Sequence, residues 1–209
     1  MEHLMLNRCL ALLLCWPLLL AAAPDRAEDI QPLPLGSTLP DVSVQTLDGE
    51  TVSARKAVQG QPTVLAFFRG GWCPYCNRQL AELRLIKDDL EALGYQLIAI
   101  SPDRPAALRE GLDKTPVDYA LLSDASAALI QALGIAFRVD DATVEQYKTY
   151  GIDLEAASGQ DHHLLPVPTV LVLDEQGVIH YRYSNADYKV RMDPDDLVRV
   201  ATRLVNPSP

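Results

Sequence analysis

One junction in the chain constrains the fold more than any other stretch. An apolar segment, Thr63 to Phe68, runs into Gly70-Gly71 and then into Cys73-Pro74-Tyr75-Cys76. A short apolar run that ends at turn residues predicts a buried strand. Pro74 suits the first turn of a helix, where its missing N–H costs nothing. The sequence therefore predicts two cysteines at the point where a buried strand gives way to a helix.

The rest of the chain keeps alternating between strand and helix patterns. The helix predicted over 74–93 carries one apolar stripe, formed by Leu80, Leu83, Ile86, Leu90 and Leu93. This order predicts one α/β domain, with a central mixed sheet flanked by helices. The other predicted elements are an N-terminal hairpin over 42–52, strands over 95–100, 119–122, 170–173 and 178–183, an insertion over 135–165, and helices that begin at Pro105, cover roughly 125–133 and begin at Asp193-Pro194.

The N-terminus has the pattern of an export signal. Arg8 precedes an apolar run from Cys9 to Ala23 that closes with small residues. The run is shorter than the roughly 20 apolar residues of a membrane span. We therefore predict a cleaved signal peptide over 1–23, a flexible leader over 24–36 and the domain over 37–206. The expected location is periplasmic or otherwise exported, without stable membrane association after cleavage; an uncleaved N-terminal anchor is the alternative.

Charge and cysteine content narrow the classes of partner and site. The 209 residues carry a formal net charge of −10, which argues against nucleic acid and anionic membrane surfaces as partners. Cleavage after residue 23 would remove one acid, one base and two of the four cysteines. The mature protein would then keep only Cys73 and Cys76, which is too few for a disulfide-rich scaffold.

The position of the cysteine pair predicts different roles for the two thiols. Cys73 lies at the start of the helix, where free backbone N–H groups and the helix dipole stabilise an anion, so its pKa should be lowered. Arg69 and Arg78 could add positive charge. Cys76 lies one turn further on the same face and is less activated. The pair thus resembles an attacking thiol and a resolving thiol.

Two structural alternatives compete with a redox role for this pair. A static disulfide would close a loop of only four residues and would stabilise weakly. A zinc site needs about four ligands. The available histidines, His162, His163 and His180, give a spacing that fits no common zinc pattern. We therefore expect neither a metal nor a cofactor, and expect His162 and His163 to be exposed in the insertion.

Several further motifs follow one another along the chain. They are Arg69-Gly-Gly-Trp-Cys-Pro-Tyr-Cys76, Leu97-Ile-Ala-Ile-Ser-Pro-Asp103, Leu121-Leu-Ser-Asp124, Leu133-Gly134, Tyr150-Gly-Ile-Asp153, Leu165-Pro-Val-Pro-Thr169 and Asp174-Glu-Gln-Gly177. In this order they resemble the peroxiredoxin-like (alkyl hydroperoxide reductase / thiol-specific antioxidant) family of the thioredoxin-like superfamily, from about Leu35 to Leu204. The resemblance implies a thioredoxin-like fold and a cis Val167-Pro168 peptide that faces the cysteines.

The chain departs from that family at one position near the attacking cysteine. Typical members place a Thr or Ser three residues before it to contact the peroxide, but Gly70 stands here. An arginine could supply the missing hydrogen bond, with Arg69, Arg182 and Arg191 as candidates. Trp72 could control access to Cys73 or simply pack beside it. Tyr147, Tyr150 and Tyr188 are expected to be packing residues.

The resemblance implies a thiol-dependent peroxidase. Cys73 would form a sulfenic acid on a peroxide, Cys76 would resolve it, and a dithiol donor such as a thioredoxin-like protein would reduce the product. The Cys-Pro-Tyr-Cys motif leaves a second hypothesis, an exported thioredoxin-type thiol–disulfide oxidoreductase acting on protein disulfides. A third is a non-enzymatic metal-binding or interaction module that keeps the fold.

Overall fold

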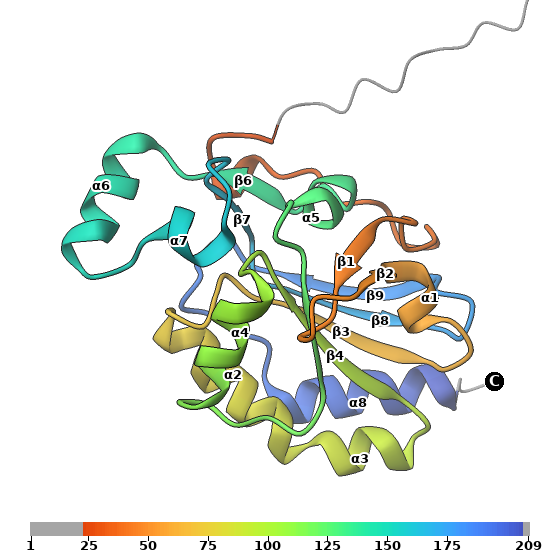
Figure 1. The fold of residues 1–209 in the computed structure, drawn as a ribbon. Helices are drawn as coiled ribbons and strands as arrows, with labels where there is room; N and C mark the ends of the chain where they lie inside the picture. Colours follow the sequence, from red (N-terminus) through yellow and green to blue (C-terminus); the bar gives the residue numbers. More distant parts are fainter. Residues whose placement is uncertain (1–22, 207–209) are drawn as a thin grey trace, which may run out of the picture.

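The computed structural model describes residues 23–206. A seven-stranded mixed sheet forms its centre, with helices on both faces, as the sequence predicts (Figure 1). The strands in spatial order are β2 (Thr51–Ser53), β1 (Ser43–Gln45), β5 (Ala120–Ser123), β4 (Gln96–Ser101), β3 (Thr63–Phe67), β8 (Thr169–Leu173) and β9 (Ile179–Ser184). The helices are α1 (Ala54–Val58), α2 (Pro74–Leu85), α3 (Lys87–Ala92), α4 (Pro105–Leu112), α5 (Ala128–Ala132), α6 (Asp141–Thr149), α7 (Leu154–Ser158) and α8 (Pro194–Val205). A 3-10 turn covers Ala27–Asp29.

Strand β3 lies inside the sheet, between β4 and β8, and leads directly to the cysteines. It pairs in parallel with β4 and antiparallel with β8, and every residue of it is buried. Its side chains alternate between two cores. Leu65 and Phe67 pack with α1 and α5, whereas Val64 and Ala66 pack with α2, α3 and α8. Both cysteines belong to this second core.

The helix predicted over 74–93 is two helices. Ile86, with φ −103° and ψ 4°, leaves helical geometry and separates α2 from α3. Leu80, Leu83, Ile86 and Leu90 are nevertheless all buried, so the apolar stripe continues across the break. The stripe was therefore predicted correctly and the continuity of the helix was not.

Residues 135–165 are more ordered than their sequence suggests. They contain a second sheet of two antiparallel strands, β6 (Ala136–Arg138) and β7 (Leu164–Pro166), joined through α6 and α7. The helices project to one side of the main sheet (Figure 1). A small core forms there from Val139, Val144, Leu154 and Leu165. Strands of three residues are too short to show a period, so only the pairing reveals them.

Residues 24–36, predicted to be a flexible leader, follow a defined path along the domain. Pro24 O accepts a hydrogen bond from Arg138 N at 2.8 Å, Leu33 N donates to Leu133 O at 3.0 Å, and Gly36 N donates to Ile179 O at 2.8 Å. The predicted signal peptide lies outside the described residues except for Ala23. Between residues 23 and 206, no helix is both long and apolar enough to cross a bilayer.

The expected cis peptide before Pro168 is wrong, since every peptide bond in the described part of the chain is trans. Hydrogen bonds on both sides fix the chain at this point. Val167 N donates to Ile135 O at 2.9 Å, and Thr169 Oγ1 donates to Val167 O at 2.8 Å. The strand pairing extends from Thr169, opposite Phe67, so Pro168 still lies beside the end of β3.

Candidate active site

The loop between β3 and α2 is held by its own backbone. Cys73 is the N-cap of α2, and its carbonyl accepts from Cys76 N and Asn77 N at 3.0 Å. Cys73 N donates to Gly70 O at 3.1 Å, and Asn77 Nδ2 donates to Gly71 O at 2.9 Å. This network places the Cys73 thiol at the helix N-terminus, where the dipole favours a thiolate.

The two thiols differ in acidity, in the direction that the sequence predicts. A hydrogen bond from Cys76 is the largest of the effects that lower the pKa of Cys73 from 9.0 to about 6, and the positive charges of Arg69 and Arg191 contribute. Burial opposes this shift. Burial is the largest of the effects that raise the pKa of Cys76 well above 9.0. Near neutral pH, Cys73 is therefore the thiolate and Cys76 the proton donor to it.

Arg69 is a buried cation enclosed by aromatic rings. Its side chain is only 4% exposed. The guanidinium carbon lies 4.3 Å from the ring centre of Tyr188, 5.3 Å from that of Trp72 and 5.7 Å from that of Tyr147. Arg69 Nη2 also donates to the Tyr147 hydroxyl. Cation–π contacts of this kind stabilise a desolvated guanidinium. The two tyrosines, which the sequence predicts to be packing residues only, therefore also hold this cation in place.

Arg191 approaches the pair from the segment between β9 and α8. Its Nη2 donates to Cys76 Sγ at 3.4 Å. Its Nε and Nη1 are buried and have no hydrogen-bond partner among the described residues, and the same is true of Arg69 Nε. Unpaired buried donors are costly and require an explanation. Arg191 reaches the cysteine pair through its contact with Cys76, and an oxygen-bearing anion or a peroxide bound there could accept from its free N–H groups.

Two other arginines do not join this group. Arg182 donates to Leu33 O at 2.6 Å, and its neighbours Tyr181 and Tyr183 are the residues that face the cysteine core. Arg182 therefore points to the opposite face of the sheet, because successive side chains of a strand alternate. Arg78 is ion-paired with Glu82 at 3.5 Å on the exposed side of α2. Neither Arg78 nor Arg182 therefore lies with the cysteine pair, as the sequence had suggested they could.

Gly70 and Trp72 are in direct contact, which explains the glycine. A Cβ atom at position 70 would lie 2.1 Å from Trp72 Nε1. No side chain, and so no hydroxyl, fits at this position while the indole stays where it is. Trp72 itself is half-buried and packs against Arg69 and Tyr147. The same Trp72 ring that packs on Arg69 thus occupies the space that a side chain at position 70 would need.

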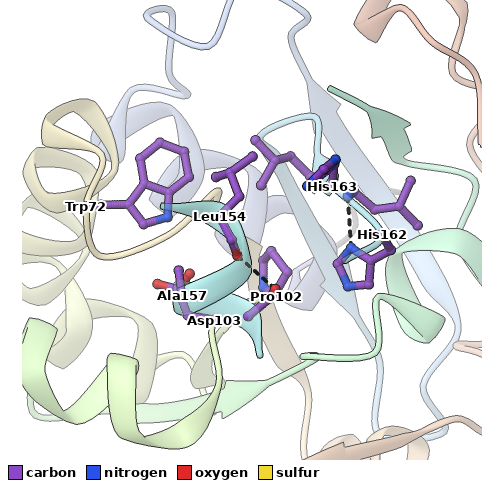
Figure 2. A pocket seen from close by; sticks show the side chains of 10 residues that line it. Trp72, Pro102, Asp103, Leu154, Ala157, His162 and His163 are labelled. Atoms are coloured by element: carbon purple, nitrogen blue, oxygen red, sulfur yellow. Dashed lines mark hydrogen bonds between the residues drawn. The ribbon is translucent and has the colours of Figure 1, made fainter. Parts of the chain in front are cut away.

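Asp103 also belongs to the site, although the sequence singles it out only as part of a motif. Its carboxylate is buried and accepts from Gly71 N at 2.7 Å, and burial is the main cause that raises its pKa to about 7. It lines a small cavity with Trp72, His162 and His163 (Figure 2). The sequence feature that could have identified Asp103 is its position as a single acidic residue just after an apolar strand.

The histidines have partners other than a metal. His162 Nε2 lies 2.9 Å from Ala125 O, His163 Nε2 lies 2.9 Å from Glu155 Oε1, and His180 Nε2 lies 2.7 Å from Asp174 Oδ2. His162 and His163 are only partly exposed, contrary to the expectation. Over residues 23–206, no group of three or more His, Cys, Asp or Glu side chains is arranged to hold a metal ion.

Comparison with known proteins agrees with this architecture. The AhpC/TSA family model matches residues 35–182. Peroxiredoxin Bcp of Escherichia coli K12 is 30% identical over 106 residues, which cover 51% of this chain and 67% of that protein. Peroxiredoxin Q of Oryza sativa subsp. japonica is 27% identical over 72% of this chain and 58% of its own length.

Solved structures show the same fold at low identity. Reduced Prx3 of Vibrio vulnificus in complex with H2O2 superposes with a TM-score of 0.67 at 16% identity, covering 81% of this chain and 99% of that one. Peroxidoxin BcpB of Mycobacterium tuberculosis gives a TM-score of 0.63 at 18% identity, covering 83% and 99%. The family model spans most of the chain, and the protein therefore belongs to the AhpC/TSA family of thioredoxin-like peroxiredoxins.

Proposed function

We propose that this protein is a thiol-dependent peroxidase in which Cys73 attacks the peroxide and Cys76 resolves the product. The observation that carries this assignment is the opposite displacement of the two pKa values, which leaves one thiolate and one protonated thiol a helical turn apart. The thiolate is the nucleophile in such reactions. Family membership supports a thiol peroxidase and does not favour the two alternative functions.

The proposed cycle has three balanced steps. The Cys73 thiolate attacks one oxygen of ROOH, the O–O bond breaks, and Cys73 becomes a sulfenic acid while RO⁻ takes up a proton and leaves as ROH. Cys76 then attacks the sulfenic sulfur, forming a Cys73–Cys76 disulfide and releasing water. A dithiol donor, for which a thioredoxin-like protein is the expected class, reduces this disulfide by exchange and is itself oxidised.

Arg69 and Arg191 replace the hydroxyl that is missing at Gly70. Arg191 Nη2 lies 3.4 Å from Cys76 Sγ, and the charges of Arg69 and Arg191 help to lower the pKa of Cys73, after the hydrogen bond from Cys76. Their unpaired N–H groups can donate to the peroxide oxygens and stabilise the charge that develops as the O–O bond breaks. Arg69, which is fixed in advance by its aromatic contacts, loses little freedom when it binds.

The roles of the two cysteines can be tested with single substitutions. In the reduced protein, Cys73→Ser should abolish oxidation by hydrogen peroxide. Cys76→Ser should still consume one equivalent of peroxide and accumulate a sulfenic acid that a dimedone probe traps. If Cys73→Ser keeps full peroxidase activity, the assignment is wrong; if Cys76→Ser accumulates no sulfenic acid, the peroxide reaction itself is in doubt.

We also propose that the protein is exported to the periplasm or beyond, with residues 1–23 as a signal peptide. The support is the sequence pattern alone, a basic residue before an apolar run that closes with small residues. N-terminal sequencing of protein recovered from a cell fractionation tests it. A mature chain that begins near Pro24 in the exported fraction is expected, whereas an intact Met1 in the membrane fraction would favour the anchored alternative.

A further inference from the structure

Asp103 is a buried carboxyl group that the proposed cycle does not use. It follows β4, and its side chain reaches across to the loop that carries Cys73. Its Oδ2 accepts from Gly71 N at 2.7 Å, while its own N–H donates to Ser101 Oγ at 3.0 Å. Gly71 in turn packs against Gly111 of α4, where a Cβ on Gly71 would lie 3.5 Å from Gly111 Cα. Asp103 is thus the side chain that ties the loop to the neighbouring strand.

The space beside Asp103 is too small for a substrate. The cavity that it shares with Trp72, His162 and His163 has a volume of about 10 Å³, the size of a single water molecule (Figure 2). A peroxide or a reductant therefore does not bind there. Trp72 Nε1 and His163 Nδ1, which belong to its lining residues, are buried without a well-formed hydrogen bond to any described residue. The cavity is consequently part of the support of the loop and not a second substrate site.

The charge of Asp103 and the charge of Cys73 influence each other. Burial is the largest cause that raises the pKa of Asp103, the Cys73 thiolate raises it further, and the hydrogen bond from Gly71 N lowers it. Two anions in one desolvated region disfavour each other, so their titrations are coupled. The charged or titratable groups around Asp103 are Cys73, His162, His163 with its partner Glu155, Arg104 next in the chain, and Arg69 behind the Trp72 ring.

We propose that Asp103 is a positioning residue of the Cys73 site: it holds the Gly71-Trp72 turn in place, and its ionised carboxylate and the Cys73 thiolate disfavour each other. This inference rests on the proposed role of Cys73 as the peroxide-attacking thiol. Its first part is geometric and requires only an acceptor at position 103. Its second part requires a group there that can ionise. The two parts can therefore be separated by substitution.

The positioning part is tested by comparing Asp103→Asn with Asp103→Ala. The Asn side chain keeps an oxygen that accepts from Gly71 N, whereas Ala removes it. At pH 6, we expect Asp103→Ala to lower the rate of Cys73 oxidation by hydrogen peroxide at least about tenfold, because small displacements of a reacting group are costly. Asp103→Asn should stay within about threefold of the parent. An unchanged rate in Asp103→Ala, or an equal loss in both variants, would overturn this role.

The electrostatic part, in which the two anions disfavour each other, is tested without any peroxide. In the reduced full chain with Trp16→Phe, Trp72 is the single tryptophan, and its emission is followed from pH 5 to 9. We expect a step near pH 7 from Asp103 and a step near pH 6 from Cys73. Asp103→Asn should abolish the first and keep the second, whereas Cys73→Ser should abolish the second and move the first to lower pH. A step near pH 7 that survives in Asp103→Asn, or one that Cys73→Ser leaves in place, would overturn the proposal.

Two controls exclude other sources of that step. His163→Gln removes the imidazole that lines the same cavity and should leave the step at its pH. Asp124→Asn changes another buried carboxyl with a raised pKa, one that accepts from Leu129 N and Ile130 N in the opposite core and should not move the Trp72 signal. These titrations need no turnover. They would therefore show whether the titrations of Asp103 and Cys73 are coupled even in a protein that failed to react with peroxide.

Discussion

At the scale of single residues, the acidity of Cys73 depends first on the hydrogen bond from Cys76 and then also on two cations, of which Arg191 is far away in sequence. Arg191 stands 115 positions from Cys76, yet its guanidinium lies 3.4 Å from that sulfur. Its charge lowers the pKa of both thiols, against burial in each case. A thiolate in a buried site needs such partners, because desolvation alone would keep it protonated.

Replacement of Arg191 should therefore slow the reaction near pH 6. Arg191→Met keeps much of the side-chain volume but removes the charge and the donor, so the pKa of Cys73 should rise and the fraction of thiolate should fall. We expect alkylation of Cys73 by iodoacetamide at pH 6 to slow by about threefold to tenfold. Arg182→Met, on the opposite face of the sheet, is the matched control and should leave the rate unchanged. Equal rates in all three proteins would contradict the role of Arg191.

Gly70 offers a second test at this scale, because it stands where the family places a hydroxyl. Restoring that hydroxyl with Gly70→Thr should lower the rate of peroxide reduction, by about tenfold or more, since the new Cβ would collide with Trp72. A shift in Trp72 emission should accompany the loss. In the Trp72→Ala background, the same substitution should cost much less. A gain of activity in Gly70→Thr alone would show that the arginines do not replace the hydroxyl.

At the scale of elements, α6 reaches the site although it belongs to the outlying part of the fold. Tyr147 of α6 holds Arg69 through its hydroxyl and its ring. Tyr147→Phe keeps the ring and removes the acceptor, so a buried guanidinium loses a hydrogen bond. We expect a loss of about 1–3 kcal/mol in the free energy of unfolding, measured by urea denaturation.

A nearby tyrosine provides the control for this change. Tyr150 follows α6 and is 66% exposed, and its hydroxyl accepts from Gln146 Nε2 at the surface. Tyr150→Phe should alter stability by no more than about 0.5 kcal/mol. If both substitutions cost the same, the Tyr147–Arg69 contact contributes nothing particular to the fold.

The strand and helix that carry the cysteines could be predicted from the sequence, whereas the aromatic contacts that hold Arg69 could not. β3 and the start of α2 follow from local features, an apolar run, a glycine pair and Pro74 at the first helical turn. Arg69 with its rings depends on Tyr147 and Tyr188, which lie 78 and 119 positions away. No periodicity connects residues at such separations. The same reasoning explains why β6 and β7 were missed. The cis peptide expected before Pro168 came from the family resemblance and not from the local sequence.

At the scale of the whole molecule, buried carboxyl groups should make stability depend on pH. Asp103 and Asp124 have pKa values of about 7 and about 6 in the folded protein, against 3.8 when unfolded. Between about pH 4 and 6, the folded state therefore binds more protons than the unfolded state, and stability falls as pH rises. Cys73 acts with the opposite sign, but only above about pH 6.

This pH dependence can be measured by chemical denaturation at pH 4.5 and pH 6. We expect the free energy of unfolding to fall by an amount on the order of 1–2 kcal/mol per pH unit over this range. The double variant Asp103→Asn, Asp124→Asn should show a clearly flatter dependence. A stability that rises from pH 4.5 to 6 in the parent protein would contradict the raised pKa values.

The central claim is that Cys73 is an activated peroxide-reactive thiolate, and stopped-flow oxidation of the reduced full chain tests it most directly. With Trp16→Phe, Trp72 emission reports oxidation by hydrogen peroxide and, separately, by a small disulfide. We predict that peroxide oxidises Cys73 far faster than it oxidises free cysteine at the same fraction of thiolate. The pH dependence of this rate should follow the pKa of Cys73, near 6. A slow reaction with peroxide and a fast one with the disulfide would contradict the account, and would make this a thiol–disulfide exchange site on a peroxiredoxin fold.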